Sequence, residues 1–308
     1  MSETIGAECP PPDKARPREA RQIARQISYA ASARTRAGRA VIRTIENACG
    51  RPGLIRRARG YQDDIAGGAD FWQVMLARYG VSVDIVSGTL APIPRQGPLV
   101  VVANHPFGIL DGLVMGALLG RLRGDFRILA HRVFAQAGDL DRVILPVDFD
   151  ETMAAQETNI ATRRAALQFL GDGGAIGVFP GGTVSTAARP FSRPLDPVWR
   201  GFTARMIARS DATVVPVYFD GANSRLFQLA SHAHYTLRMG LLMSEFRART
   251  DRPVQIAVGA PLGPATLAPY RRDPRGMMDF LRERTYALSP TPPPAASYGF
   301  EFEARYKD

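Results

Sequence analysis

Short apolar runs alternate with helical windows over most of the chain after residue 60. The runs are rich in valine and isoleucine and predict strands at Leu99–Ala103, Phe126–Ala130, Val143–Val147, Ala175–Phe179, Thr213–Phe219 and Val254–Val258, after alternating positions at Val81–Val86. Helical windows lie at Asp70–Tyr79, Gly112–Leu122, Asn159–Leu170, Val198–Ser210, Tyr235–Arg247 and Arg275–Leu288. This alternation is typical of buried parallel strands. We therefore predict an α/β domain, with a mostly parallel mixed sheet flanked by helices.

The first 59 residues follow a different pattern. Residues 1–18 are polar and rich in proline, which predicts a flexible tail. Residues 19–48 lack proline and predict a helix that gathers isoleucine, valine and alanine on one face, at Ile23, Ile27, Ala30, Ala37, Val41 and Ile45. We divide the chain into a tail at 1–18, a basic amphipathic helical appendage at 19–59, a domain at 60–290 and a C-terminal tail at 291–308.

The positive charge of the chain is concentrated in this appendage. Between Lys14 and Arg59 there are thirteen basic residues and two acidic ones, whereas the formal net charge of the whole chain is +10. Each cation near an anionic bilayer contributes about 1 kcal/mol to binding. The appendage is therefore predicted to lie on an anionic membrane surface. Two alternatives stay open, a helix packed on the domain and an organellar transit peptide.

Composition excludes several classes of protein. The 308 residues are 45% apolar and 22% charged, which is ordinary for a globular chain. The apolar runs are shorter than the roughly 20 residues of a spanning helix, and the first 20 residues have no apolar signal core. We expect a cytoplasmic protein, peripheral on the inner membrane. Cys9 and Cys49 are too few for a disulfide framework, and lysine occurs only at Lys14 and Lys307, which excludes lysine chemistry inside the domain.

Two predicted strand ends carry candidate chemistry, because reactive groups gather at the carboxyl ends of strands in open α/β sheets. In the first, a buried strand ends at Asn104 and His105, Gly108 allows a turn, and Asp111 opens the next helix. A carboxylate that fixes the histidine tautomer makes the other ring nitrogen a general base. The alternative is that His105 and Asp111 only cap the loop and the helix.

The second strand end is a turn of small residues with hydroxyl groups. It comprises Phe179, Pro180, Gly181, Gly182, Thr183 and Ser185 around Val184. Backbone N–H groups in such a turn can bind an oxyanion or a phosphate. A tight turn without a ligand remains the alternative.

Four sequence blocks, taken together, resemble the glycerolipid and lysophospholipid acyltransferase family. They are Asn104–Gly108, Ile144–Asp148, Phe179–Gly182 and Asp220–Phe227, and they occur in order within Phe71–Gly263. The chain is most similar to the bacterial hemolysin-like branch, which includes enzymes that complete ornithine lipids. The resemblance implies an O-acyltransferase that moves a fatty acyl group from an acyl carrier protein or acyl-CoA thioester to the hydroxyl of a lyso-lipid.

The resemblance also implies roles for individual residues. His105 is then the general base and Asp111 its orienting partner, with no acyl-enzyme, no metal and no cofactor beyond the thioester co-substrate. Asn104, Gly108 and the Phe179–Ser185 turn would bind substrate. Asn223 and Arg225 follow another strand end, and Arg225 is predicted to contact an anionic head group or the carrier, or to form a surface salt bridge.

The chain departs from the family pattern at three positions. Five residues separate His105 from Asp111, one more than is common in the family, and Gly108 can absorb the extra residue. The usual Phe-Pro-Glu-Gly-Thr-Arg-Ser block has Gly181 in place of the acid and Val184 in place of the arginine. Loss of both charges weakens phosphate recognition. We therefore expect an acceptor other than lysophosphatidate, such as a lyso-ornithine lipid.

Other functions are weaker interpretations of the same residues. A catalytically inactive lipid-binding or regulatory protein on the same fold is the main alternative. Nucleic acid is not an expected partner, because the basic segment lacks interleaved aromatic residues. His232 and His234 lack a neighbouring third ligand for a metal site and are predicted to serve packing, the surface or a head group.

Overall fold

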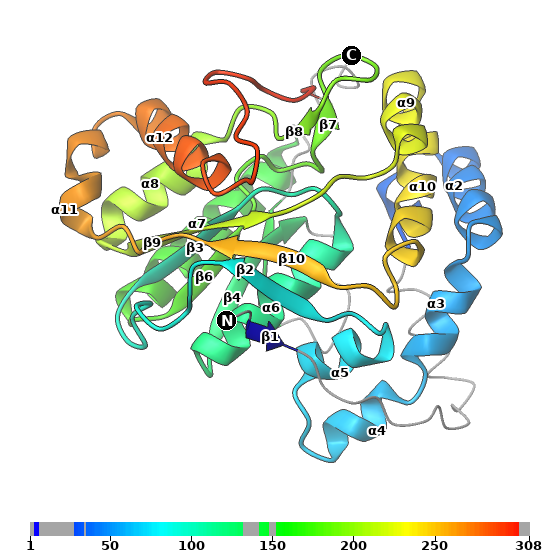
Figure 1. The fold of residues 1–308 in the computed structure, drawn as a ribbon, viewed down its shortest axis with the longest axis horizontal. Coiled ribbons are helices and arrows are strands. Elements are labelled where there is room, and N and C mark those ends of the chain that lie inside the picture. Colours follow the sequence, from blue (N-terminus) through cyan, green and yellow to red (C-terminus); the bar gives the residue numbers. More distant parts are fainter. Residues whose placement is uncertain (1–2, 6–27, 34, 132–141, 148–151, 302–308) are drawn as a thin grey trace.

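The protein is an α/β fold built on one mixed sheet. The computed structural model describes residues 3–5, 28–33, 35–131, 142–147 and 152–301. The sheet has the order β1-β2-β10-β9-β3-β6-β4-β5 (Figure 1). Its strands are β1 (Glu3–Ile5), β2 (Val83–Ser87), β3 (Leu99–Ala103), β4 (Phe126–His131), β5 (Ile144–Val147), β6 (Ala175–Val178), β9 (Thr213–Phe219) and β10 (Val254–Val258). The prediction of a mixed sheet flanked by helices is confirmed.

Most neighbouring strands in this sheet run parallel. β9, β3, β6, β4 and β5 form a parallel block, in which Leu99 pairs with both Ala175 and Thr213. β10 runs antiparallel to β9, β2 pairs in parallel with β10, and β1 pairs antiparallel with β2. The carboxyl ends of β3, β6 and β9 therefore meet at one edge of the sheet. The two turns predicted to carry the candidate chemistry also lie at this edge.

Helices cover both faces of the sheet. One face packs on α5 (Phe71–Arg78), α6 (Ile109–Leu122) and α10 (Tyr235–Arg247), and the other on α7 (Met153–Gly171), α8 (Gly201–Ser210) and α12 (Pro274–Tyr286). Strand β3 shows why: Val101 and Ala103 join the first core, and Val100 and Val102 join the second. All five residues of β3 are buried, as its unbroken apolar run predicts.

The remaining elements are short or lie near the chain ends. They are η1 (Ala30–Ser32), α2 (Arg36–Ala48), α3 (Arg51–Ala58), α4 (Tyr61–Ala66), β7 (Thr186–Ala187), β8 (Pro194–Leu195), α9 (Arg225–Ala233), α11 (Pro264–Leu267) and η3 (Ala268–Tyr270). Strands β7 and β8 form a separate antiparallel pair. None of the helices in the described residues is both long and apolar enough to cross a bilayer.

The helix predicted over 19–48 is shorter than its sequence pattern suggests. Residues 19–27 lie outside the described part of the chain, η1 forms a separate turn, and α2 begins only at Arg36. Thr35 is the N-cap of α2, because its hydroxyl accepts the Gly38 N–H. The prediction of one continuous helix is therefore wrong in its N-terminal part.

Helix α2 packs on the domain. Its buried residues are Ile42 and Glu46, and Ile45 lies against Gly240 of α10, where an added Cβ would come within 2.8 Å of it. Of the face predicted to be apolar, Ile45 packs on α10, whereas Val41 is 46% exposed. In the described residues, one side of α2 packs on the domain, as the packing alternative predicts, and the other side is exposed.

Both predicted tails contain residues that contact the sheet region. Glu3–Ile5 form the edge strand β1, which corrects the prediction of an unstructured tail at this point. At the other end, the Gly299 N–H donates to the Asp196 carbonyl and the Phe300 N–H to the Thr186 carbonyl. The chain through residue 301 therefore reaches the elements that surround the candidate site.

Candidate active site

Asn104 joins the ends of two strands at the floor of the site. Its Nδ2 donates to the Phe219 carbonyl at 2.9 Å, and the Phe219 N–H donates to its Oδ1 at 2.7 Å. These two bonds extend the pairing of β3 and β9 by one residue, in a side chain that is 3% exposed. Asn104 is therefore a structural clamp that fixes where His105 leaves the sheet.

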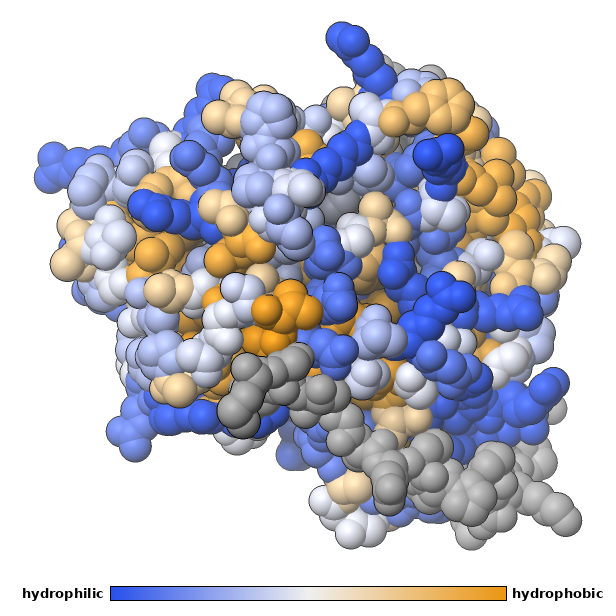
Figure 2. Space-filling model, in the orientation of Figure 1, coloured by the Kyte–Doolittle hydropathy of each residue, from blue (hydrophilic) through white to orange (hydrophobic). Residues whose placement is uncertain are grey.

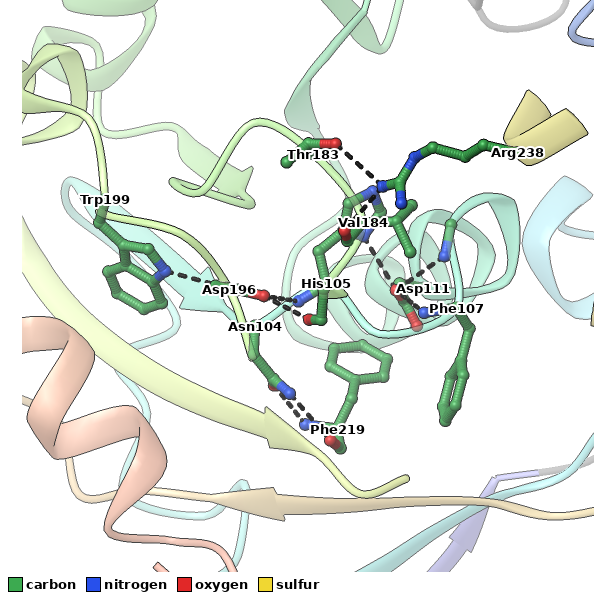
Figure 3. A network of polar contacts seen from close by, with 12 residues as sticks. Asn104, His105, Phe107, Asp111, Thr183, Val184, Asp196, Trp199, Phe219 and Arg238 are labelled. Carbon is green, nitrogen blue, oxygen red and sulfur yellow. Dashed lines mark hydrogen bonds and ion pairs between the residues drawn. The ribbon is translucent and has the colours of Figure 1, made fainter. Parts of the chain in front are cut away.

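His105 and Asp111 lie in direct contact (Figure 3). His105 Nδ1 is 2.9 Å from Asp111 Oδ2, within hydrogen-bond reach, and the His105 ring stacks on Phe179 at 4.3 Å between centroids. The His105 side chain is 19% exposed, whereas Asp111 is fully buried. Because Nδ1 faces the carboxylate, Nε2 is the ring nitrogen left toward the cavity, which is the arrangement a general base needs.

The environment of Asp111 shifts its titration. Oδ2 also accepts the backbone N–H groups of Phe107 at 2.8 Å and Gly108 at 3.1 Å. These bonds and His105 stabilise the carboxylate, but burial outweighs them and raises the pKa of Asp111 above its usual value. A buried carboxylate that contacts one ring nitrogen orients the imidazole.

Gly108 makes the longer spacing between His105 and Asp111 possible. Its φ of 83° and ψ of −122° are open to glycine and strained for other residues. The turn at Gly108 lets α6 begin at once, so Asp111 falls in its first turn and bends back to His105. The structure thus shows how the extra residue is absorbed.

A buried carboxylate connects the Phe179–Ser185 turn to the turn that carries His105. Asp196 Oδ1 accepts the His105 N–H at 3.1 Å and the Ser185 hydroxyl at 2.5 Å, and Oδ2 accepts Trp199 Nε1 at 2.9 Å (Figure 3). The Ser185 N–H donates to the His105 carbonyl at 2.8 Å. Asp196 is fully buried and lies against Gly181, where an added Cβ would come within 3.3 Å of it. It holds both turns in register.

A largely apolar cavity of about 300 Å³ opens beside His105. Five residues predicted to bind substrate line it together with His105, namely Gly108, Phe179, Pro180, Gly182 and Thr183. One end runs between α6 and the strands β4 and β5, past Leu113, Ile128, Ile144 and Trp72. The volume and the lining are typical of a small-molecule or lipid site.

Arg238 of α10 brings a positive charge to the cavity wall. Its side chain is 2% exposed and donates to the Val184 carbonyl at 2.9 Å, Thr183 Oγ1 at 3.2 Å and Thr186 Oγ1 at 2.7 Å (Figure 3). The guanidinium thus lies beside the backbone of the turn that has lost an arginine from the family pattern. Sequence reasoning missed Arg238 because it comes from a distant helix with no motif around it.

Several predicted residues lie away from the cavity lining. Asn223 is buried just before α9, and Arg225 is exposed in the first turn of α9. Three further predicted residues do not line the cavity, namely Gly181, Ser185 and Asn104. His232 faces the Ala187 carbonyl at 2.9 Å, and His234 caps α10. Asp148 lies outside the described residues. Within the described ranges, no three His, Cys, Asp or Glu side chains come close enough to hold a metal ion.

Comparisons with known proteins match the chain to acyltransferases. The model of the family described as Acyltransferase matches residues 67–291. A lyso-glycine lipid O-acyltransferase from Phocaeicola vulgatus is 22% identical over 228 residues, covering 72% of this chain and 78% of the relative. One of the same name from Bacteroides thetaiotaomicron is also 22% identical, with 72% and 80% covered. A solved 1-acyl-sn-glycerophosphate acyltransferase, PlsC from Thermotoga maritima, is 17% identical with 82% and 85% covered and a TM-score of 0.37, too low to support an argument.

Proposed function

Because the chain belongs to the acyltransferase family, we propose that it is a lyso-lipid O-acyltransferase in which His105 is the general base. One observation carries this proposal: His105 Nδ1 lies 2.9 Å from the buried Asp111, beside an apolar cavity of about 300 Å³. A base held by a carboxylate next to a space for a fatty chain is what acyl transfer to an alcohol requires.

The reaction follows from this arrangement in two steps. The acceptor hydroxyl gives its proton to His105 Nε2 while its oxygen attacks the carbonyl carbon of the thioester, so that a tetrahedral oxyanion forms. The oxyanion then collapses, the carbon–sulfur bond breaks, and the thiolate leaves with the proton from His105. Asp111 stabilises the imidazolium between the two steps and keeps the tautomer correct for the next cycle.

For the acceptor, we favour a lyso-lipid with an amino-acid head group. Both similar acyltransferases are named for a lyso-glycine lipid. Gly181 and Val184 stand where the family pattern has an acid and an arginine, and the Arg238 guanidinium beside this turn donates to the turn itself. A lyso-ornithine or lyso-glycine lipid is therefore preferred over lysophosphatidate. Asn223 and Arg225 remain proposals for head-group or donor contacts.

The donor is an acyl thioester of an acyl carrier protein or coenzyme A. Its fatty chain fits the arm of the cavity that runs along α6. Gly112 and Leu113 line this arm on the helix side, and Ile128 and Ile144 line it on the strand side. Trp72 also lines it, packed so closely on Gly116 that a Cβ there would meet the indole at 2.1 Å. Apolar burial of the chain supplies binding free energy of about 0.8 kcal/mol per methylene group.

The enzyme meets its lipid at a membrane surface through the outer face of α9 and α10. Leu226 and Leu229 of α9 are 65% and 39% exposed, and Leu237, in the first turn of α10, is 40% exposed. Figure 2 shows apolar residues gathered on this side of the molecule, over α9, α10 and α2. Arg225 and Arg36 are exposed on the same elements and complement anionic head groups. We name this the α9–α10 face.

An acyl-transfer assay with purified protein tests the proposal. The wild-type chain is given an acyl-CoA or an acyl carrier protein thioester, with lyso-ornithine lipid, lyso-glycine lipid or lysophosphatidate in mixed micelles. We expect turnover with an amino-acid lyso-lipid, reduced about 10²–10⁴-fold by His105→Ala. Absence of turnover with every pair would favour the inactive lipid-binding alternative, and preference for lysophosphatidate would overturn the assignment of the acceptor.

A further inference from the structure

A short segment near the N-terminus forms part of the cavity that contains His105. Residues 28–33 precede α2 and lie outside residues 67–291, which match the family model. Tyr29 and Ser32 of this segment line the cavity, and Tyr29 is 8% exposed. The cavity is therefore assembled from the family domain and from a segment that the family model does not include.

Glu46 of α2 holds this segment in place. Its carboxylate accepts the Ser28 hydroxyl and the Tyr29 N–H, both at 2.6 Å, and the side chain of Glu46 is fully buried. Arg51 Nε lies 3.7 Å from the same carboxylate and compensates part of its charge. Because the two short bonds fix the backbone at Tyr29, the direction of the tyrosine ring is set by α2.

The Tyr29 hydroxyl lies over the first turn of α6. It is 3.2 Å from the position that a Cβ on Gly108 would take, so only glycine allows this approach. The backbone N–H of Ile109 acts on the phenol oxygen, and so do the charges of Asp111 and Arg238. Burial raises the pKa of Tyr29 above its usual value, so the phenol keeps its proton at working pH.

Several backbone donors near His105 are engaged within the protein. The Phe107 and Gly108 N–H groups donate to Asp111, the Gly182 N–H to the Phe179 carbonyl, and the Ser185 N–H to the His105 carbonyl. The Ile109 N–H, at the positive end of α6, acts on the Tyr29 oxygen. The dipole of this N–H group polarises the phenol and makes its O–H a stronger donor.

We propose that Tyr29 is a further catalytic residue, whose O–H donates a hydrogen bond to the oxyanion formed from the thioester carbonyl. The proposal rests on the proposed function, because it assigns a role within the same reaction. The negative charge appears on the carbonyl oxygen when the acceptor oxygen bonds to carbon, and it disappears when the carbon–sulfur bond breaks. Tyr29 keeps its proton throughout, while His105 carries the transferred proton.

The Tyr29→Phe variant of the full chain tests this role, since it removes only the hydroxyl. A donor to an oxyanion acts mainly in the transition state, so we expect kcat to fall about 10²–10³-fold with the KM of both substrates within about twofold. The pH profile keeps its shape, because the variant leaves His105 and Asp111 in place. The measurement uses the donor and acceptor that support wild-type turnover.

The matched control is Tyr79→Phe, which also removes a buried phenol hydroxyl but lies outside the cavity against Phe246. It should leave kcat and KM unchanged, and thermal unfolding should show both variants folded. Glu46→Gln weakens the hold on the segment and should lower kcat in the same direction as Tyr29→Phe. An active wild type whose kcat is unchanged by Tyr29→Phe, or whose KM alone rises, overturns the role of Tyr29 and leaves that of His105 standing.

Discussion

The single side chain that best links stability to catalysis is Asp111. Burial raises its pKa, so the folded protein binds a proton there more readily than the unfolded chain, whose pKa is near 3.8. Above that pH the unfolded state holds fewer protons at this site, and the stability of the fold falls as pH rises. The carboxylate that orients the base therefore destabilises the protein at the pH at which it works.

Asp111→Asn separates these two effects. An amide has no such titration. The unfolding temperature of the variant minus that of the wild type should therefore increase from pH 4 to pH 8. Activity should fall by up to about 10⁴-fold, because an amide no longer selects the required imidazole tautomer. Thermal unfolding across this range and a turnover assay measure both. A constant difference in unfolding temperature would show that the buried charge does not control stability.

Gly108→Ala tests the turn that brings His105 and Asp111 together. A methyl group at this φ of 83° is strained, and it would lie 3.2 Å from the Tyr29 hydroxyl. We expect a loss of about 1–3 kcal/mol in the free energy of unfolding, measured by denaturant titration, and lower kcat. Wild-type values for both would mean that the loop tolerates other conformations.

These residues also show what the sequence could and could not reveal about the site. His105 and Asp111 are close along the chain and follow a buried strand, so their contact was predictable from local pattern. Asp196, Arg238 and Tyr29 reach the site only through tertiary packing, and nothing in their own neighbourhoods marks them. Conversely, Arg225 follows a strand end as expected, yet its place in the first turn of α9 is exposed.

Among the secondary-structure elements, α6 carries both Asp111, the proposed partner of the base, and one wall of the proposed acyl arm. Gly112 lies on its cavity side, and an added Cβ there would meet no atom within 4 Å. A side chain at this position therefore extends from an unobstructed Cβ into the cavity, and a good helix former also improves the helix by up to about 0.8–1.0 kcal/mol relative to glycine. The position offers a change that stabilises the fold and alters the substrate.

Gly112→Leu should shorten the fatty chain that the enzyme accepts. Donors with long chains should lose turnover relative to short-chain donors, while the unfolding temperature rises. Turnover with a series of acyl thioesters of increasing length measures the preference. Gly120→Ala, on the same helix but outside the cavity lining, is the control for helix stability. An unchanged length preference in Gly112→Leu would place the acyl chain elsewhere.

The elements were predicted well where burial is continuous and poorly where tertiary contacts decide. Strand β3 and helix α10 have the predicted bounds, since each forms under a strong local pattern. The segment before α2 has a helical pattern as well, but the bonds from Ser28 and Tyr29 to Glu46 hold it in another conformation. Such long-range polar contacts leave no periodic signal in the sequence.

Across the molecule as a whole, charge and apolar exposure point to the same side. The basic appendage of the sequence contributes α2, which packs beside α10, so exposed Arg36 and Arg39 lie close to the α9–α10 face. The membrane contact predicted for residues 19–48 stays a prediction, and we propose that α2 contributes cations to it while α9 and α10 contribute the exposed leucines. Cations attract the protein to an anionic bilayer, and apolar side chains then insert at its surface.

The double variant Leu226→Glu with Leu229→Glu tests this face. Two carboxylates in place of exposed leucines should reduce sedimentation with vesicles of mixed phosphatidylglycerol and phosphatidylcholine, and the binding of wild type should weaken as salt rises, because salt screens the arginines. The matched control is Met153→Glu with Ile160→Glu on α7, where 79% and 49% exposed apolar residues lie on the other face of the sheet. Equal vesicle binding by both double variants would assign the membrane contact to another surface. Turnover with a short-chain acceptor in detergent should stay at the wild-type level in both, since neither pair lines the cavity.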